Sequence, residues 1–250
     1  MQFDFETGEI LLIDKPIGWT SFDVVNHLRV LIRRHLNIQK LKVGHAGTLD
    51  PLATGLLIVC TGKMTKQIQQ FQDQDKTYTG TFRLGMSTPS YDLETEADAT
   101  FPTAHLTREM LINNCKSYIG TIQQLPPVFS AIKIDGKRAF NYARKNQEVA
   151  ISPRTVQVSK FELTHINIPD VDFVINCSKG TYIRSLAHDF GKSLQNGATL
   201  TRLRRTHIGS FNVEQAYSLE HLREVLAKAT APHKEIGESN TLSNLSTEKS

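Results

Sequence analysis

The feature that most constrains the fold is an irregular alternation of strand-like and helix-like segments along the chain. The strand-like segments are either apolar throughout or alternate apolar and polar residues. Several of them follow one another as antiparallel neighbours do, and no regular repeat orders the whole. The pattern favours an α+β fold around a mixed sheet.

Local composition and periodicity place the expected elements. Helices are expected over residues 21–36, 106–120, 138–145 and 181–194. The first has Ser21 as its expected N-cap and an apolar face made of Val24, Val25, Leu28, Leu31 and Ile32. Strands are expected over residues 9–16, 55–62, 76–85, 156–164, 171–177 and 198–211, with two short extended pieces in 120–136 around Pro126 and Pro127.

Length and composition exclude several classes of protein. A chain of 250 residues with 39% hydrophobic content can bury a sizeable core, as one large domain or two small ones. It has no run of about 18 apolar residues, and its first residues are acidic where a signal peptide is basic. We therefore expect a cytoplasmic protein without a membrane segment. The composition becomes polar near residue 230, which predicts a folded part over 1–229 and a disordered tail over 230–250.

The three cysteines suggest neither disulfides nor a metal site. Cys60, Cys115 and Cys177 are scattered, with no C-x-x-C pair and no histidine at ligand spacing. We expect buried thiols and no bound metal.

Basic residues are unevenly distributed, although the net charge is only +4. Residues 28–42 contain five basic residues and no acid, and residues 133–160 and 179–205 are also rich in Lys and Arg. Such clusters suit a polyanion, but solvated helix faces have the same composition. Charge alone leaves both interpretations open.

An aspartate stands on a bend rich in small residues, in the segment GHAGTLDPLATG of residues 44–55. Its glycines permit positive φ or close backbone approach, and Pro51 disfavours helical geometry at Asp50. The carboxylate of Asp50 is therefore expected on a stiff bend. A tight surface turn in which the aspartate caps its own backbone would have the same local sequence.

Six segments, in this order, resemble the TruB family of tRNA pseudouridine-55 synthases. They are KPIGWTS (15–21), GHAGTLDPLATG (44–55), DKTYTGTFRLG (75–85), QLPPVFSAIKIDGKRAFNYAR (124–144), CSKGTYIRSLAHDFG (177–191) and LRRTHIGSF (203–211). The resemblance covers residues 8–222. It implies the pseudouridine-synthase fold, a central mixed, mostly antiparallel sheet flanked by helices and loops, with 1–229 as the catalytic domain.

The implied reaction breaks the N-glycosidic bond of a uridine, turns the uracil in place and rejoins it through carbon, without a cofactor. Asp50 matches the family's catalytic aspartate, which either attacks C1′ or assists elimination from C2′. Arg184 matches its charge partner, because an anion in a dry pocket needs a cation to stay ionised. Tyr78 resembles the ring that stacks on the target base and helps to move a proton.

Further residues are implied to bind the substrate. Tyr182 resembles a second aromatic residue of the pocket, and Leu203 would close its apolar wall. His45 matches the residue that fills the gap left by the extruded uridine. Lys15 is expected to reach the RNA backbone or to support the active-site loop. Asp92 stands where the family has an aspartate in a T-x-T-x-D-x-x-G run.

The sequence departs from the family at several positions. That run here has Ser90 in place of its second threonine and Thr95 in place of its glycine. Phe140 replaces a common tyrosine. Lys133 and Arg154 are weaker candidates for phosphate contacts. Many relatives carry a further RNA-binding PUA domain, which the polar residues 230–250 do not resemble.

The resemblance implies tRNA as the partner, bound through its T-arm stem-loop, with no obligate protein partner and a monomeric enzyme. An RNA-binding protein that helps tRNA to fold without turnover is the alternative. The pair Asp50 and Arg184 favours the enzyme, because an anionic side chain beside a polyanion does not help pure binding. A hydrolase is less favoured, since no recognisable motif supplies a second carboxylate as acid.

Overall fold

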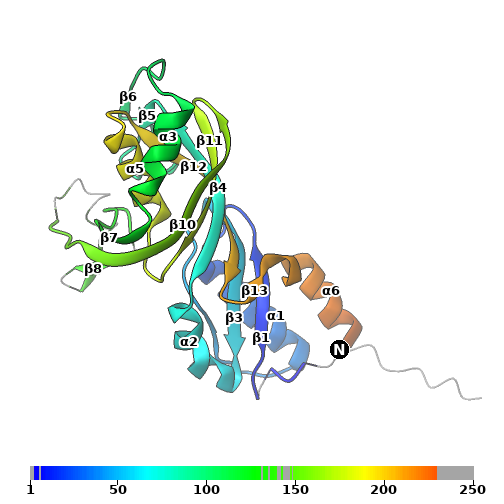
Figure 1. Cartoon of the computed structure of the whole chain (residues 1–250). Helices are drawn as coiled ribbons and strands as arrows, with labels where there is room; N and C mark the ends of the chain where they lie inside the picture. The colour runs from blue at the N-terminus through cyan, green and yellow to red at the C-terminus, as the bar shows by residue number, and fades with distance from the viewer. Residues whose placement is uncertain are drawn as a thin grey trace, which may run out of the picture.

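A nine-stranded sheet runs through the molecule in the order β1-β3-β12-β4-β11-β10-β7, with β13 paired to β12 and β2 paired to β3. The structure is a computed structural model, and it describes residues 3–5, 7–130, 132–134, 136–139, 142, 147 and 149–229. Strand β12 runs parallel to β3, and the other pairs described in this sheet are antiparallel. The expected α+β fold with a mixed, mostly antiparallel sheet is confirmed (Figure 1).

The elements of the described residues have the following bounds. The strands of the sheet are β1 Ile10–Lys15, β2 Val43–His45, β3 Ala53–Thr61, β4 Lys76–Leu84, β7 Gly120–Gln124, β10 Arg154–Asn167, β11 Asp170–Cys177, β12 Ala198–Ile208 and β13 Phe211–Asn212. Two small hairpins pair β5 Met86–Ser87 with β6 Ala99–Thr100, and β8 Lys133–Ile134 with β9 Lys137–Arg138. The helices are α1 Ser21–Leu36, α2 Ile68–Asp73, α3 Arg108–Lys116, α5 Ile183–Ser193 and α6 Leu219–Ala229, with short 3-10 turns at Gly62–Gln67 and Val213–Gln215.

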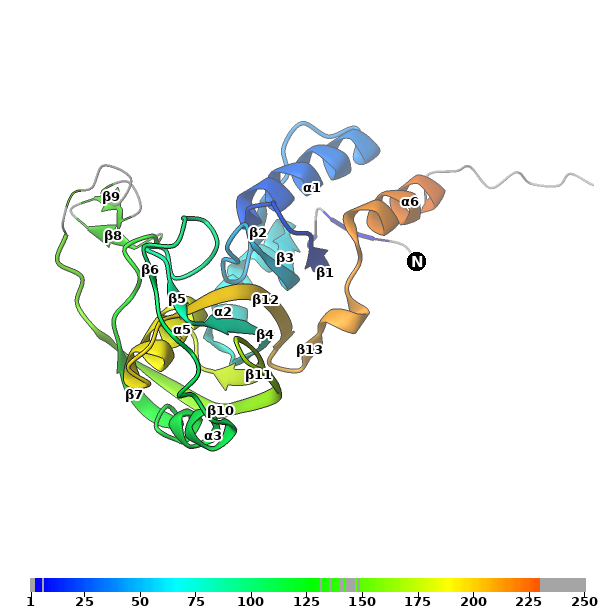
Figure 2. The same cartoon turned by 90° about the horizontal axis from the view of Figure 1, so that it is seen from above.

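Two groups of helices cover different parts of the sheet. Helices α1 and α6 lie together over β1 and β3, whereas α3 and α5 pack on the part formed by β4, β10, β11 and β12 (Figures 1 and 2). In the first core, Leu28 and Ile32 of α1 meet Leu222 of α6. In the second, Phe190 of α5 packs near Phe82 of β4. The cavity described below is lined by residues of β4, β10 and β12 and by the loops beside them.

Close approach of β12 to β3 requires a glycine at position 55. Gly55 has φ +104°, and a Cβ there would lie 2.3 Å from the carbonyl oxygen of Arg205. No other residue fits such a contact without moving the backbone. The parallel register pairs Gly55 with Arg205 and Ala53 with Leu203, which brings β12 beside the bend that carries Asp50.

The start of α1 differs from the sequence-based expectation. Thr20, not Ser21, is the N-cap, and it forms a reciprocal capping box with Asp23. Ser21 is buried instead, and its hydroxyl donates to the carbonyl of Leu49 at 3.2 Å and accepts from the Leu49 amide at 2.8 Å. The expected N-cap therefore serves as a tie between α1 and the loop before Asp50.

Most of the expected strands and helices are present in the structure. The strands expected near β1, β3, β4, β10, β11 and β12 and the helices expected near α1, α3 and α5 are present, but α2 and α6 were not expected. All three cysteines are buried and free, as expected. Phe140, most of the helix expected over 138–145 and the tail 230–250 lie outside the described residues. Of the helices that the structure describes, none combines the length and apolar character needed to cross a bilayer.

Candidate active site

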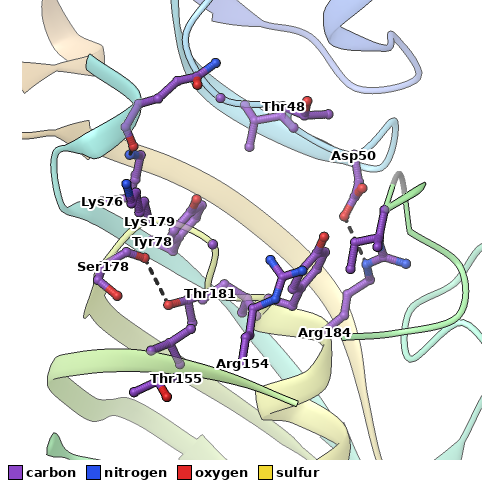
Figure 3. A pocket seen from close by; sticks show the side chains of 18 of the residues that line it. Thr48, Asp50, Lys76, Tyr78, Arg154, Thr155, Ser178, Lys179, Thr181 and Arg184 are labelled. Carbon is purple, nitrogen blue, oxygen red and sulfur yellow. Dashed lines mark hydrogen bonds and ion pairs between the residues drawn. The ribbon is translucent and has the colours of Figure 1, made fainter. Parts of the chain in front are cut away.

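A cavity of about 1010 Å³ opens between the loop that carries Asp50, the start of α5 and the strands β4, β10 and β12. Figure 3 shows Asp50 and Arg184 together at one side of it and Lys76 and Lys179 at the other, with Arg154 and Tyr78 between them. Five segments far apart in the sequence thus contribute to one site.

Asp50 and Arg184 form an ion pair at the wall of this cavity. Arg184 Nε lies 3.0 Å from Asp50 Oδ2, and the side chains are 4% and 38% exposed respectively. Arg184 also lies 3.6 Å from Asp92 Oδ2 and donates to the carbonyl of Ser90 at 3.3 Å. The guanidinium is therefore buried and held from several sides, while the carboxylate of Asp50 stays open to the cavity.

The environment of Asp50 acts on its pKa in two directions. Burial raises the pKa of the Asp50 carboxyl above its usual range, and the negative charges of Asp92 and Glu94 act in the same direction. The positive charge of Arg184 opposes that rise. Arg184 is thus the group that opposes protonation of this carboxyl in a poorly solvated place.

The loop that carries Asp50 is tied down residue by residue. Arg205 donates to the carbonyls of Gly47 at 3.0 Å and Thr48 at 3.5 Å, and Ser21 holds Leu49 as described above. On the far side of Asp50, the carbonyl of Pro51 accepts from the Gly18 amide at 2.8 Å and from Lys15 Nζ at 3.4 Å. The expected stiff bend is present, and its stiffness comes from these tertiary contacts as well as from Pro51.

Three predicted aromatic and apolar residues line the cavity with Asp50. They are Tyr78 on β4, Tyr182 just before α5 and Leu203 on β12. Burial raises the pKa of the Tyr78 phenol, and the positive charge of Arg205 acts against that rise. The backbone of Tyr182 is fixed by Gln124, whose side chain accepts from its amide at 2.7 Å and donates to its carbonyl at 3.0 Å.

The other three predicted residues lie around the cavity without lining it. Lys15 is fully buried, and its ammonium donates to the carbonyls of Pro16, Trp19 and Pro51. These contacts tie Lys15 to the loop that carries Asp50, and its expected role toward the RNA stays a prediction. Asp92 is 5% exposed and contacts Arg184. His45 lies in β2, and its Nδ1 is buried without a hydrogen-bond partner among the described residues.

Arg205 is a cavity residue that the sequence does not reveal. It stands in a run of basic residues that fits either a polyanion-binding cluster or a solvated face, but it is 1% exposed and donates to three backbone carbonyls. Alternation along β12 could have indicated that Arg205 faces the same side as Leu203. Its partners could not be found that way, because they belong to another strand and its loop.

The basic cluster over residues 179–205 is largely neutralised by partners distant in sequence. Arg202 pairs with Asp172, Arg204 pairs with Asp14, and Lys179 pairs with Asp73. Arg154 differs, because its guanidinium lies over the ring of Tyr182 at 5.2 Å and forms no ion pair within the described part of the chain. The side chain of Lys133 lies outside the described residues.

Family models match most of the chain. Residues 33–183 match the N-terminal domain of the TruB family pseudouridylate synthases, and residues 184–243 match the tRNA pseudouridylate synthase B C-terminal domain. The second match starts at Arg184 and continues beyond the described residues. The expected division into 1–229 and 230–250 stays a prediction.

Curated relatives named tRNA pseudouridine synthase B are similar over most of their length. That of Bacteroides fragilis is 54% identical over 212 residues, 85% of this chain and 91% of the relative. That of Flavobacterium johnsoniae is 51% identical over 224 residues, which are 89% of this chain and 98% of the relative. That of Chloroherpeton thalassium is 47% identical over 227 residues, which are 90% of this chain and 93% of the relative.

Solved structures share the fold. The crystal structure of a Cbf5-Nop10-Gar1 complex is 31% identical with a TM-score of 0.65, over 88% of this chain and 54% of that one. An H/ACA RNP bound to a substrate RNA containing 2′-deoxyuridine is 28% identical with a TM-score of 0.62, over 88% of this chain and 53% of that one. With the family models and the curated relatives in agreement, the chain belongs to the TruB family of pseudouridine synthases.

Proposed function

We propose that this protein is a tRNA pseudouridine synthase that isomerises a uridine of the T-loop, with Asp50 as the catalytic residue. The observation that carries the proposal is the ion pair of Asp50 and Arg184, in which a held cation keeps an accessible carboxylate ionised inside a cavity. Curated relatives of similar length named tRNA pseudouridine synthase B support the same activity.

The reaction is an isomerisation and needs no external reactant. The bond from N1 of uracil to C1′ of the ribose breaks, and a bond from C5 to C1′ forms. A proton leaves C5 and a proton is gained at N1, so atoms and electrons balance. As the base departs, C1′ becomes electron-poor, and a carboxylate beside it can attack C1′ or stabilise the developing charge.

The remaining cavity residues have roles that follow from their contacts. Arg184 holds the Asp50 carboxylate in its ionised form. Tyr78, whose pKa is raised by burial, stays a neutral phenol at neutral pH and supplies a flat wall for the uracil. Tyr182 and Leu203 complete the wall around the base. Lys15 and Ser21 act on the substrate through the loop that they fix, and Arg205 both fixes this loop and lines the cavity.

The substrate uridine has to leave the RNA stack to reach Asp50. Extruding a base costs a few kcal/mol, and enzymes of this kind recover the cost through contacts with the flipped nucleotide and its neighbours. The cavity is large enough for a nucleotide, and Arg154, which has no ion pair among the described residues, offers a cation for a phosphate beside it. We propose that His45 fills the space that the uridine leaves.

Recognition is proposed to be local to the T-arm stem-loop, with the enzyme acting as a monomer and without a protein partner. RNA loops whose bases can be splayed out are the usual targets of sequence-specific proteins. A cytoplasmic location and a tRNA-folding role besides catalysis stay predictions.

The proposal is tested by incubating the protein with unmodified tRNA and with a T-arm hairpin, followed by nucleoside analysis of the loop. Pseudouridine at a single loop position is expected with the wild-type protein. The Asp50→Asn variant is expected to bind both RNAs and to form none. Binding of RNA without any pseudouridine in the wild-type reaction would support the RNA-folding alternative.

A further inference from the structure

The loop of residues 88–95, here loop 88–95, turns at a tyrosine in an unusual backbone conformation. Tyr91 has φ +63°, in the left-handed region that bulky residues occupy only where their surroundings fix them. Its two chain neighbours, Ser90 and Asp92, both contact Arg184. The chain therefore reverses at Tyr91 between two contacts with the residue that pairs with Asp50.

The ring of Tyr91 stacks on His188 of helix α5. The ring centroids are 4.1 Å apart and the planes differ by 22°. His188 lies four residues after Arg184, so the two side chains share one face of α5. The carbonyl of Tyr91 also accepts from the amide of Leu200 on β12 at 2.9 Å. Tyr91 thus fastens loop 88–95 to α5 and to β12.

Side chains inside loop 88–95 complete its shape. Thr95 stands where the family pattern has glycine, and its hydroxyl accepts from the Ser90 amide at 3.1 Å and lies 2.9 Å from Ser90 Oγ. Thr88 Oγ1 donates to the carbonyl of Asp92 at 2.7 Å. The departure from the family pattern is therefore accommodated by a hydroxyl that the loop uses internally.

Tyr91 and His188 are not among the described residues that line the cavity. A substrate held at Asp50 would not touch them, so any effect on catalysis must pass through the loop and Arg184. We infer that Tyr91 and His188 are positioning residues, whose stacked rings hold loop 88–95 on α5 so that Ser90 and Asp92 fix Arg184 against Asp50. The inference rests on the proposed function, because its first measurement is turnover.

Four substitutions test the inference. Tyr91→Asn removes the ring, while asparagine tolerates the left-handed backbone. Tyr91→Phe keeps the ring. His188→Ala removes the other half of the stack, and His188→Phe restores a ring there. Because misplacing catalytic groups by about 1 Å can cost about 100-fold, kcat on a T-arm hairpin is expected to fall about 10- to 100-fold in Tyr91→Asn and His188→Ala. KM should change by less than about threefold, and both ring-retaining variants should stay near wild type.

A pH profile separates positioning from general destabilisation. The charged and titratable groups that act on or respond to Asp50 are Arg184, Asp92, Glu94, Lys15 and Tyr78. Loosening loop 88–95 weakens the contact with Arg184, which raises the pKa of Asp50. Retreat of Asp92 and Glu94 lowers the pKa of Asp50 by less, because the charge of Arg184 acts on that pKa more strongly than the charge of either acid. The acidic limb of kcat should therefore move to higher pH in Tyr91→Asn and His188→Ala.

The matched control is Tyr118→Ala. Tyr118 is a half-buried tyrosine that packs near Phe161 and Phe190, and its hydroxyl lies 3.0 Å from Ser193 Oγ. Removing it should lower Tm while leaving kcat and the acidic limb in place.

If the wild-type protein forms no pseudouridine, the proposed function is wrong. If the wild-type protein is active and Tyr91→Asn keeps its kcat, the inference alone is overturned. A kcat that falls equally in Tyr91→Phe, or an acidic limb that does not move when kcat falls, also overturns it.

Discussion

Arg184 and Asp50 form an asymmetric ion pair, in which the cation is 4% exposed and the anion is 38% exposed. The guanidinium is fixed by Ser90 and Asp92, which are not among the described residues that line the cavity, so it is held in place before any RNA binds. The negative charge of Asp50 is therefore stabilised by a cation that the fold has already oriented. Electrostatic pre-organisation of this kind is a large contributor to enzymatic rate enhancement.

The first prediction concerns the cation of this pair. In Arg184→Met, the opposing effect on the pKa of Asp50 is lost, so the pKa rises and less of the carboxylate is ionised at neutral pH. We expect kcat to fall by about 100-fold or more and the acidic limb of activity to move to higher pH. The kcat and the acidic limb of Arg184→Lys should lie between those of wild type and those of Arg184→Met. Single-turnover rates from pH 5 to 9 would measure this, and an unmoved limb in an active Arg184→Met variant would contradict the assignment.

The second prediction concerns the alkaline side of the pH profile. Burial lowers the pKa of Lys15 to about 8, and its protonated amine donates to three carbonyls, among them that of Pro51 next to Asp50. Below about pH 8 the protonated amine of Lys15 has three N–H groups to donate, and above that pH the neutral amine has only two. Activity should therefore decline as the pH rises through about 8, and Lys15→Met should have a lower activity without that decline.

Lys76 is the control for this prediction, because its pKa is also lowered to about 8 by burial. Its ammonium caps the end of α2 through the carbonyls of Gln72 and Gln74, and within the described part of the chain it forms no hydrogen bond with the Asp50 loop. If Lys76→Met loses the alkaline decline and Lys15→Met keeps it, the decline belongs to Lys76.

The third prediction concerns phosphate contacts. Each phosphate contacted by a cation contributes about 0.7 to 0.9 to the slope of log K against log salt. Arg154→Met should weaken RNA binding and reduce that slope by about one such unit. Arg83→Met should change neither, since Arg83 is exposed and paired with Asp170. Fluorescence anisotropy titrations between 50 and about 200 mM salt would measure both, and equal slopes for wild type and Arg154→Met would remove Arg154 from the interface.

The fold was predictable where local sequence decides the structure. Strand β3 is apolar over most of its length and α1 carries a one-sided apolar face, so both could be placed from the chain alone. Helix α2 has only six residues and one buried apolar side chain, Phe71, which gives no periodic signal. Sequence could not supply the parallel register of β12 on β3, because that register depends on the fit of Gly55 against Arg205.

Part of the site was predictable, again where local sequence decides the structure. The bend at Asp50 is visible from Pro51 and the glycines, and the family resemblance adds Arg184. The indirect contacts were not visible: Ser21 resembled a helix cap, Arg205 stood in a cluster of basic residues, and Tyr91 stood at a position that the T-x-T-x-D-x-x-G run leaves unspecified. Each acts through a partner at least 28 residues away in the sequence, or through a backbone conformation that composition does not encode.

The fourth prediction concerns His45 and the extent of the RNA that is recognised. A T-arm hairpin should be modified nearly as well as whole tRNA, because the residues proposed to bind RNA lie in or around the cavity that holds Asp50. His45→Ala should raise KM more than it lowers the single-turnover rate at saturating RNA, since the residue is proposed to hold the loop open. An inert hairpin beside an active tRNA would place the main contacts outside the T-arm.

The most direct test of the Asp50 assignment follows the proton that leaves C5 when the new carbon–carbon bond forms. A T-arm hairpin carrying uridine tritiated at C5 is incubated with wild type, with Asp50→Asn and with Asp170→Asn, whose carboxylate is paired with Arg83 at the surface. We predict one tritium released per target uridine with wild type and Asp170→Asn, and none with Asp50→Asn although it still binds the hairpin. Tritium release by Asp50→Asn at a rate near wild type would contradict the account.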